Sequence, residues 1–270
     1  NLVLMAAKYA GWRFIILTTE TEIKDFKATM VNFLVNGHLD KTRDQDIASA
    51  LEFIDQHVTF IENDLDHLQI FDVYHYEKTQ GNYYDCIVVD PITNIEESKQ
   101  IKGYGNDYYR QLYIEYLKFT KKYCATWIIS HTVSQKEREH SAPYIQDAEY
   151  GVHLFRRCHY GVALHRDMHD EIDKNKVEAH VRAVRTAITR GGNVTMSNEP
   201  VEFHLNIDST HFGYNIVVDG HQYKNPLIFG NQPEKTLTDP GPSHYEKEPK
   251  ELDATDGFRA DTGDEEEPPF

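Results

Sequence analysis

The sequence predicts an α/β fold in which a mostly parallel sheet carries helices on both faces and antiparallel strands at its edge. In the first half, short β-branched runs alternate with segments of helical periodicity, and residues 84–91 are apolar on both faces until an Asp-Pro pair ends the run. In the second half, strand patterns surround a hairpin signal at residues 190–193. We expect residues 1–220 to form one domain. Residues 221–270, rich in Pro, Gly, Asp and Glu, are expected to form a disordered acidic tail.

The first three elements each have their own pattern. The opening residues are typical of the last turns of a helix that ends at Gly11. Residues 13–20 form an apolar strand that ends on Glu20, and Thr21 is expected to cap the next helix. Apolar residues at three- and four-residue spacing give that helix a buried face: Ile23, Phe26, Met30, Phe33 and Leu34.

Helices and strands then alternate up to residue 146. We expect a helix, a strand, a helical or mixed segment and the central strand at residues 47–54, 57–61, 65–76 and 84–90. A loop at residues 96–105 leads into a helix whose buried face carries Tyr109, Leu112, Tyr116 and Phe119. A strand at residues 125–130 and a polar loop at 132–146 follow.

The remaining elements are mainly strands. A short helix is predicted at residues 147–157, a strand at 160–166 and a charged turn at 167–176. Residues 177–186 alternate as a strand does, and residues 201–205 form the returning strand after the hairpin.

Charge and cysteine content restrict the class of protein. The net charge is −16, and residues 233–270 contribute −8 of it, with twelve acidic against four basic residues, so the body is only mildly acidic and a DNA partner is not excluded. The three cysteines lie in or beside apolar runs without paired spacing, which indicates a reducing compartment: the cytoplasm, or the host-cell cytoplasm for a viral protein. No apolar stretch reaches membrane-spanning length.

Polar residues stand where three apolar strands end: Glu20, Asp90 and His131. In a parallel sheet these side chains emerge at one edge, where open α/β sheets bind ligands. Asp90 could then hold a hydrated Mg²⁺ on a nucleotide triphosphate, Glu20 could polarise a water for attack on the γ-phosphate, and His131 could hydrogen-bond that phosphate. The alternative is that each is an ordinary polar strand end, with Asp90 capping the turn beside Pro91.

With these motifs in this order, residues 1–212 resemble the RecA-like hexameric replicative DNA helicases, which include DnaB, mitochondrial Twinkle and phage helicase-primases. Residues 2–20 resemble the helix after the family's phosphate loop and the strand with its catalytic glutamate. Residues 87–90 resemble its Walker B strand, and residues 127–131 its sensor strand, where a His or Gln stands in the place of His131. The resemblance implies an ATP- and Mg²⁺-dependent helicase that translocates on single-stranded DNA as a homo-oligomer, expected to be a hexamer.

Residues 181–185 resemble the family's strand that ends in Lys-x-Arg, whose last Arg reaches the nucleotide of the neighbouring subunit. The resemblance implies that Arg185 is this catalytic finger, with a surface ion pair as the alternative. Ala183 replaces the Lys, which leaves Arg182 as the candidate for a second cofactor-binding cation. Because side chains alternate along a strand, Arg182 faces the other way from Arg185.

Two further segments are candidate contact sites. In the loop after His131, Lys136 and Arg138 are the only cations, and the resemblance implies that they bind DNA. They alternate with Glu137 and Glu139, so a solvated face is the alternative. The acidic run that ends in Phe270 can dock its ring in an apolar pocket with a basic rim on a replication protein. A solubilising tail is the alternative.

One part of the family pattern is missing. The 270 residues contain no Gly-rich loop with a following Gly-Lys-Ser/Thr, so this polypeptide as given should bind ATP poorly, and truncation of a longer protein is the simplest explanation. Two other classes stay open: a catalytically inactive RecA-like module that recruits replication proteins through its acidic tail, and another RecA-like ATPase of recombination or clock type. A phosphate-loop sequence encoded upstream of Asn1 would favour the helicase over the inactive module.

Overall fold

The computed structural model describes residues 1–61, 65–133, 141–167, 175–185, 200–207, 212–218, 221–223 and 227. By its contacts the chain divides into two units, Asn1–Asn231 and Gln232–Phe270. The second unit, with the predicted disordered tail and Phe270, lies outside the described residues. In the described part, no helix is long and apolar enough to cross a membrane.

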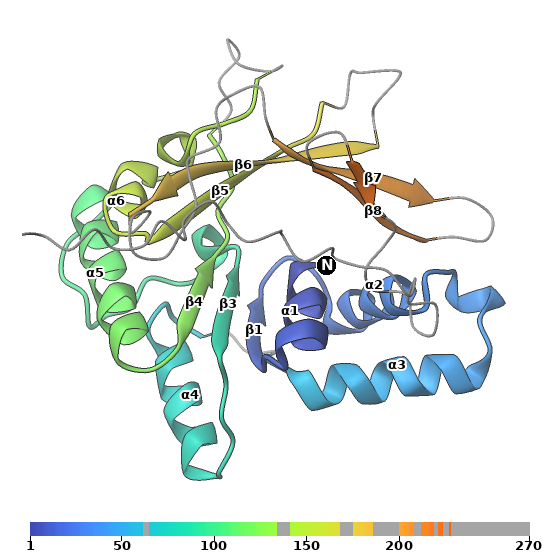
Figure 1. Cartoon of the computed structure of the whole chain (residues 1–270). Helices are drawn as coiled ribbons and strands as arrows, with labels where there is room; N and C mark the ends of the chain where they lie inside the picture. Colours follow the sequence, from blue (N-terminus) through green and yellow to red (C-terminus); the bar gives the residue numbers. More distant parts are fainter. Residues whose placement is uncertain are drawn as a thin grey trace, which may run out of the picture. The chain divides into compact units, whose positions relative to one another are not determined.

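A four-stranded parallel sheet carries the core of the first unit (Figure 1). Its strands are β1 (Phe14–Thr18), β2 (Val58–Ile61), β3 (Cys86–Asp90) and β4 (Ala125–Ile128), in the order β2-β1-β3-β4. β3 pairs with β1 on one side and with β4 on the other. All residues of β1 and β3 except the last are buried, as expected for strands covered on both faces. The predicted central parallel strand is confirmed.

Different helices cover the two faces of this sheet. Because side chains alternate along a strand, one face of β1 and β3 carries Ile15, Leu17, Ile87 and Val89. This face packs against α4 (Gln69–Thr79) and α5 (Asn106–Lys122). The other face packs against α1 (Leu2–Ala10), α2 (Ile23–Val35) and α3 (Asp44–His57). Figure 1 shows the two groups of helices on opposite sides of the strands, as predicted.

Local contacts explain where several helices begin and end. α1 ends at Gly11 as predicted, with φ of 66°, a conformation that glycine adopts without a steric penalty. The predicted cap at Thr21 is wrong: the cap position of α2 is Glu22, and the Thr21 carbonyl instead accepts the Thr18 hydroxyl at 3.4 Å. α4 begins later than predicted because the Asp66 carboxylate accepts the first free N–H groups of the helix start.

The antiparallel strands form a second sheet of their own, instead of edge strands of the first. They are β5 (Tyr160–His165), β6 (Lys176–Val184), β7 (Val201–Ile207), β8 (Phe212–Val218) and β9 (His221–Tyr223), paired in chain order. Among the described strands no ladder joins the two sheets. After β4 the chain first forms η4 (Ile145–Asp147) and α6 (Gly151–Phe155), two short helices in place of the single one predicted at residues 147–157.

Aromatic side chains attach the second sheet to α2. The Phe33 ring lies 5.1 Å from that of Phe212 and 5.6 Å from that of Tyr214, measured between centroids. Leu205 of β7 packs against the same core cluster. β8 and β9 had no counterpart in the sequence prediction, and the predicted hairpin at residues 190–193 lies outside the described residues.

Candidate functional site

The carboxyl ends of β1, β3 and β4 meet at one edge of the parallel sheet. The N–H of Thr19 donates to the Asp90 carbonyl at 3.1 Å, and the N–H of Ile129 donates to the Val89 carbonyl at 2.9 Å. These bonds continue the ladder just past the strands. Three polar side chains follow at this edge, and they are named here the strand-end site: Glu20, Asp90 and His131.

Glu20 and His131 are in direct contact. Nε2 of His131 lies 3.1 Å from Oε1 and 3.2 Å from Oε2 of Glu20. The side chains are 61% and 44% exposed for His131 and Glu20, so the pair contributes only about 0–1 kcal/mol to stability. Both groups are therefore open to solvent and to a ligand while they orient one another.

Asn94 is a third member of this contact that the sequence prediction did not include. Its Nδ2 donates to Oε1 of Glu20 at 2.8 Å. Asn94 lies in η2 (Ile92–Asn94), the short helix that follows Asp90. The Glu20 carboxylate is thus oriented from both sides, by an amide after β3 and an imidazole after β4. A polar residue soon after the Asp-Pro turn was the signal available in the sequence.

A buried hydrogen-bond chain fixes the loop that carries Asn94. Nε2 of His67 donates to the Ile92 carbonyl at 2.8 Å, and because a carbonyl only accepts, Nδ1 accepts the Tyr108 hydroxyl at 2.8 Å. The Tyr108 oxygen accepts the Ser98 N–H at 2.7 Å. Burial lowers the pKa of His67, although the bond to the Ile92 carbonyl opposes this shift. The neutral His67 ring thus holds one end of the loop directly at Ile92 and the other end, through Tyr108, at Ser98.

The Asp90 carboxyl lies between the other two groups of the strand-end site. Burial raises its pKa above the ordinary value, the Glu20 carboxylate raises it further, and His131 lowers it. Within the described residues it has no hydrogen-bond or ion-pair partner. Carboxylate oxygens are preferred donors for Mg²⁺, which keeps several waters. The described part holds no group of three acidic, His or Cys side chains that could hold a metal ion.

The Arg185 side chain contacts the end of α6. Its Nη2 donates to the Phe155 carbonyl, at the end of α6, at 3.0 Å. In the described part it contacts none of Glu20, Asp90 and His131. The Arg185 side chain is therefore exposed beside the end of α6.

Arg182 is held by backbone groups. It donates to the carbonyls of Ala142 and Pro143 at 3.2 and 3.1 Å, and its guanidinium lies 4.6 Å from the centroid of the Tyr144 ring. These contacts occupy the planar guanidinium on two sides. They place Arg182 beside the end of the loop that follows His131.

That loop begins and ends at the same place. Thr132 forms an antiparallel bridge with Ala148, and the N–H of Val133 donates to the Asp147 carbonyl at 2.8 Å. Lys136 and Arg138, predicted to bind DNA, lie between these points but outside the described residues. The bridge starts one residue after His131, so the strand-end site and the base of the loop are adjacent in the chain.

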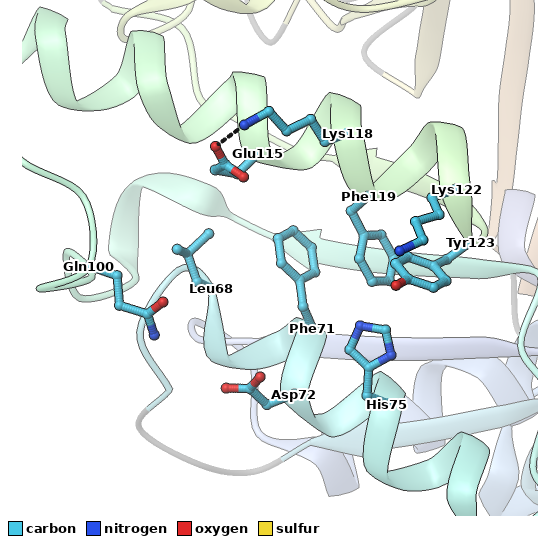
Figure 2. Close-up of a pocket in the computed structure, with 10 residues that line it drawn as sticks. All are labelled: Leu68, Phe71, Asp72, His75, Gln100, Glu115, Lys118, Phe119, Lys122 and Tyr123. Carbon is cyan, nitrogen blue, oxygen red and sulfur yellow. Dashed lines mark hydrogen bonds and ion pairs between the residues drawn. The ribbon is translucent and has the colours of Figure 1, made fainter.

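A groove of about 320 Å³ lies between α4 and α5, and its residues are not those of the strand-end site. Figure 2 shows its floor and rim, which are formed by Leu68, Phe71, Asp72, His75, Gln100, Glu115, Lys118, Phe119, Lys122 and Tyr123. The rings of Phe71 and Phe119 stack at 4.2 Å, and Glu115 pairs with Lys118 at 2.7 Å. Because its charges are balanced and its rings pack on each other, the groove indicates no particular class of ligand.

Solved structures share this fold, and two of them are described here. One, described as an ATPase domain, matches with a TM-score of 0.61 at 14% identity, over 78% of this chain and 79% of that one. A DnaB-like replicative helicase, described with its interactions with primase, matches with a TM-score of 0.60 at 14% identity, over 76% of this chain and 52% of that one. No protein-family model and no curated protein sequence matches. The likeness confirms that the chain has the RecA-like fold of DnaB-like helicase ATPase domains.

Proposed function

We propose that this chain is the motor domain of a ring-forming, ATP-dependent replicative DNA helicase. The observation that carries the proposal is the strand-end site, in which Glu20, Asp90 and His131 meet at the carboxyl edge of a parallel sheet. Open α/β sheets bind ligands at this edge. The fold shared with helicase ATPase domains supports the same choice of activity.

Each residue of the site has a proposed role in hydrolysis. Glu20 orients and polarises the attacking water, since a carboxylate oriented by two neighbours can accept a proton along a fixed direction. His131 donates a hydrogen bond to the terminal phosphate, so its position depends on whether this phosphate is bound. Asp90 holds Mg²⁺ through water, and the ion, when bound, neutralises charge on the phosphate oxygens.

Arg185 is proposed to act on the nucleotide of the neighbouring subunit. Among the described residues its side chain contacts none of the three residues of the strand-end site and bonds only a backbone carbonyl. That bond can be exchanged for a charge-assisted bond to phosphate, which is stronger. An arginine supplied in this way is worth about 10³- to 10⁵-fold in rate in related enzymes. We assign Arg182 to support of the loop base rather than to the nucleotide.

The proposed partners follow from the same role. Single-stranded DNA would contact residues 134–140 through Lys136 and Arg138, and the ring would consist of six copies of the chain. The acidic tail ending in Phe270 would bind a basic-rimmed pocket on another replication protein. We place the activity in the cytoplasm, including that of a host cell, because Cys86, Cys124 and Cys158 are all free thiols.

A RecA-like module without hydrolysis is the second candidate. It is favoured by one observation, the absence of a Gly-Lys-Ser/Thr sequence from the 270 residues. Reading the coding sequence upstream of Asn1 separates the candidates. A Gly-rich run ending in Gly-Lys-Ser/Thr supports the motor, and a start codon without such a run supports the module.

Mixing of mutant subunits tests the motor and its ring. In the protein that includes the phosphate loop, Glu20→Gln and Arg185→Ala should each abolish most DNA-stimulated ATP hydrolysis. A ring that mixes the two mutants contains interfaces with an intact Glu20 and an intact Arg185, so mixing should restore part of the activity. Near-normal turnover of Glu20→Gln would remove the catalytic assignment, and two inactive mutants that never complement each other would remove the role of Arg185 in trans.

A further inference from the structure

Two neighbouring tyrosines in the first turn of α5 are each linked to a different residue of the strand-end site. Tyr108 and Tyr109 are 1% and 6% exposed, and their ring centroids lie 5.4 Å apart with the planes at 78°. Because successive residues on a helix point about 100° apart, the two rings leave α5 in different directions. One ring contacts the loop that follows β3, and the other contacts the start of α6 (Figure 1).

The Tyr108 hydroxyl is linked to Glu20 through the loop after β3. It accepts the Ser98 N–H at 2.7 Å and donates to Nδ1 of His67 at 2.8 Å, so it acts both as acceptor and as donor. His67 in turn holds the first residue of η2, and the last residue of η2, Asn94, bonds the Glu20 carboxylate. Loss of the Tyr108 hydroxyl would therefore loosen the amide that orients Glu20.

The Tyr109 ring is linked to His131 through the segment before α6. It stacks on the Tyr150 ring, with centroids 4.0 Å apart and the planes at 13°. Tyr150 has φ of 53°, which is uncommon for a bulky side chain, and the stack helps to hold it there. The residue before it, Glu149, donates its N–H to the His131 carbonyl at 3.3 Å. The stacked rings thus fix the segment that holds the His131 backbone.

Packing in the core explains only part of this arrangement. Both rings belong to the core cluster on the side of the parallel sheet that faces α5. Tyr113 shows what packing alone produces: it is 2% exposed on the same helix, but its hydroxyl has no hydrogen-bond partner in the described structure. The Tyr108 hydroxyl, in contrast, makes two hydrogen bonds, and both lead to the loop that carries Asn94.

We propose that Tyr108 and Tyr109 are positioning residues that set Glu20 and His131 relative to one another. The inference rests on the proposed hydrolysis and deepens it, because it makes the first turn of α5 the element that controls both groups. Their contact of 3.1 Å is sensitive to small shifts, and a displacement of about 1 Å in a reacting site can cost on the order of 100-fold in rate. A looser Glu20 should slow hydrolysis, whereas a looser His131 should weaken binding of the terminal phosphate.

Hydrogen exchange in the absence of nucleotide tests the positioning itself. Tyr108→Phe should speed exchange of the Ser98 amide about five- to tenfold, because this amide loses its acceptor. Tyr109→Leu should speed exchange of the Glu149 amide by a similar factor, whereas Tyr109→Phe keeps the stacked ring and should not. Tyr113→Phe is the matched control, since it removes a buried hydroxyl without a partner from the same helix, and both amides should exchange as in wild type.

Kinetics of the protein that includes the phosphate loop test the link to hydrolysis. Tyr108→Phe should lower kcat about 10-fold and leave KM for ATP unchanged. Tyr109→Leu should raise the Kd for ATP about 10-fold and leave the Kd for ADP unchanged, because ADP lacks the terminal phosphate. Tyr108→Phe should add little loss in a Glu20→Gln background, and Tyr109→Leu should add little in a His131→Ala background.

The outcomes separate this inference from the proposed function. Faster exchange together with both kinetic effects supports the positioning roles. Faster exchange with unchanged kinetics would show that the tyrosines only stabilise the loops, and unchanged exchange would show that they do not hold them, so either result overturns the inference. Full additional losses in the Glu20→Gln and His131→Ala backgrounds would also overturn it. If wild type hydrolyses no ATP, the motor function fails, and hydrogen exchange still decides whether the tyrosines hold the two segments.

A second variant covers the case in which Tyr109→Leu does not fold. Tyr150→Asn removes the same ring stack from the side of α6, and asparagine tolerates the φ of 53° at this position. It should speed exchange of the Glu149 amide and raise the Kd for ATP as Tyr109→Leu does. Wild-type exchange and affinity in Tyr150→Asn would overturn the role of the stack.

Discussion

The imidazole of His131 lies 3.1 Å from the carboxylate of Glu20, although 111 residues separate them in the chain. The strands that precede them, β4 and β1, are not neighbours in the sheet, because β3 lies between them. The contact therefore reaches past the end of β3, where Asp90 is located. A shift of any one of these strand ends would change the geometry of the other two.

Removing the Asn94 amide should slow hydrolysis without weakening nucleotide binding. Asn94 holds one oxygen of Glu20, so Asn94→Ala allows this carboxylate to turn, and such a displacement can lower kcat about 10- to 100-fold. The measurement is kcat and KM for ATP in the protein that includes the phosphate loop, with KM expected to stay the same. In a Glu20→Gln background Asn94→Ala should add little further loss. A full additional loss there would show that Asn94 does not act through Glu20.

Asp90→Asn should stabilise the fold at neutral pH. The pKa of Asp90 is raised in the folded state, so its favourable contribution is complete below the unfolded value of about 3.8 and is lost as pH rises through the folded pKa. At pH 7 the amide should raise the free energy of unfolding by about 0.5–1 kcal/mol, since solvent screens a half-buried carboxylate. Denaturant titrations at pH 7 and pH 3.5 check this, and an advantage that is equal at both pH values would contradict it.

The stabilising role of His67 should be lost in acid. Its pKa is lowered in the folded state, so its contribution is present above the unfolded value of 6.5 and is lost as pH falls through the folded pKa, although Glu97 and Asp66 oppose the shift. His67→Gln should cost about 1–3 kcal/mol at pH 7, because it leaves buried polar partners unpaired. That cost should shrink by up to about 1.4 kcal/mol per pH unit below 6.5. A cost independent of pH would show that folding does not shift the pKa of His67.

Gly151→Ala should destabilise the fold more than Gly161→Ala. A methyl group at Gly151 would overlap the backbone carbonyl of Ile145, which cannot move without shifting η4, whereas one at Gly161 meets the Ile145 side chain at 2.8 Å, which can rotate. We expect a loss of about 1–3 kcal/mol for Gly151→Ala and a smaller loss for Gly161→Ala. Urea unfolding of the two variants gives the comparison, and the reverse order would contradict the described packing of η4 against α6.

The strand ends could be predicted from the sequence because each apolar run stops at a polar residue. Parallel pairing then brings Glu20, Asp90 and His131 together without further information. Asn94 could not be predicted in the same way. Its direction depends on η2, which is set by the bond between His67 and the Ile92 carbonyl, 25 residues apart. Periodicity contains no signal for such a contact.

The division of the strands into two sheets could not be predicted from the sequence either. A strand pattern predicts which residues are extended, but it does not predict which strands pair with each other. The chain leaves the first sheet after β4 and forms η4 and α6 before β5 begins the second sheet. β8 was missed because its sequence, Phe-Gly-Tyr-Asn-Ile-Val-Val, has a glycine and an asparagine among its apolar residues. Its place is set by contacts of Phe212 and Tyr214 with Phe33, about 180 residues earlier in the chain.

The bridge between Thr132 and Ala148 has a mechanical consequence. It closes the base of residues 134–140 one peptide away from His131, and Arg182 anchors the returning side at Ala142 and Pro143. In the proposed motor, a force that bound DNA exerts on this loop would therefore act directly on the bridged residues Thr132 and Ala148. Because His131 directly precedes the bridge, its imidazole would then respond both to the force on the DNA and to the terminal phosphate of the nucleotide.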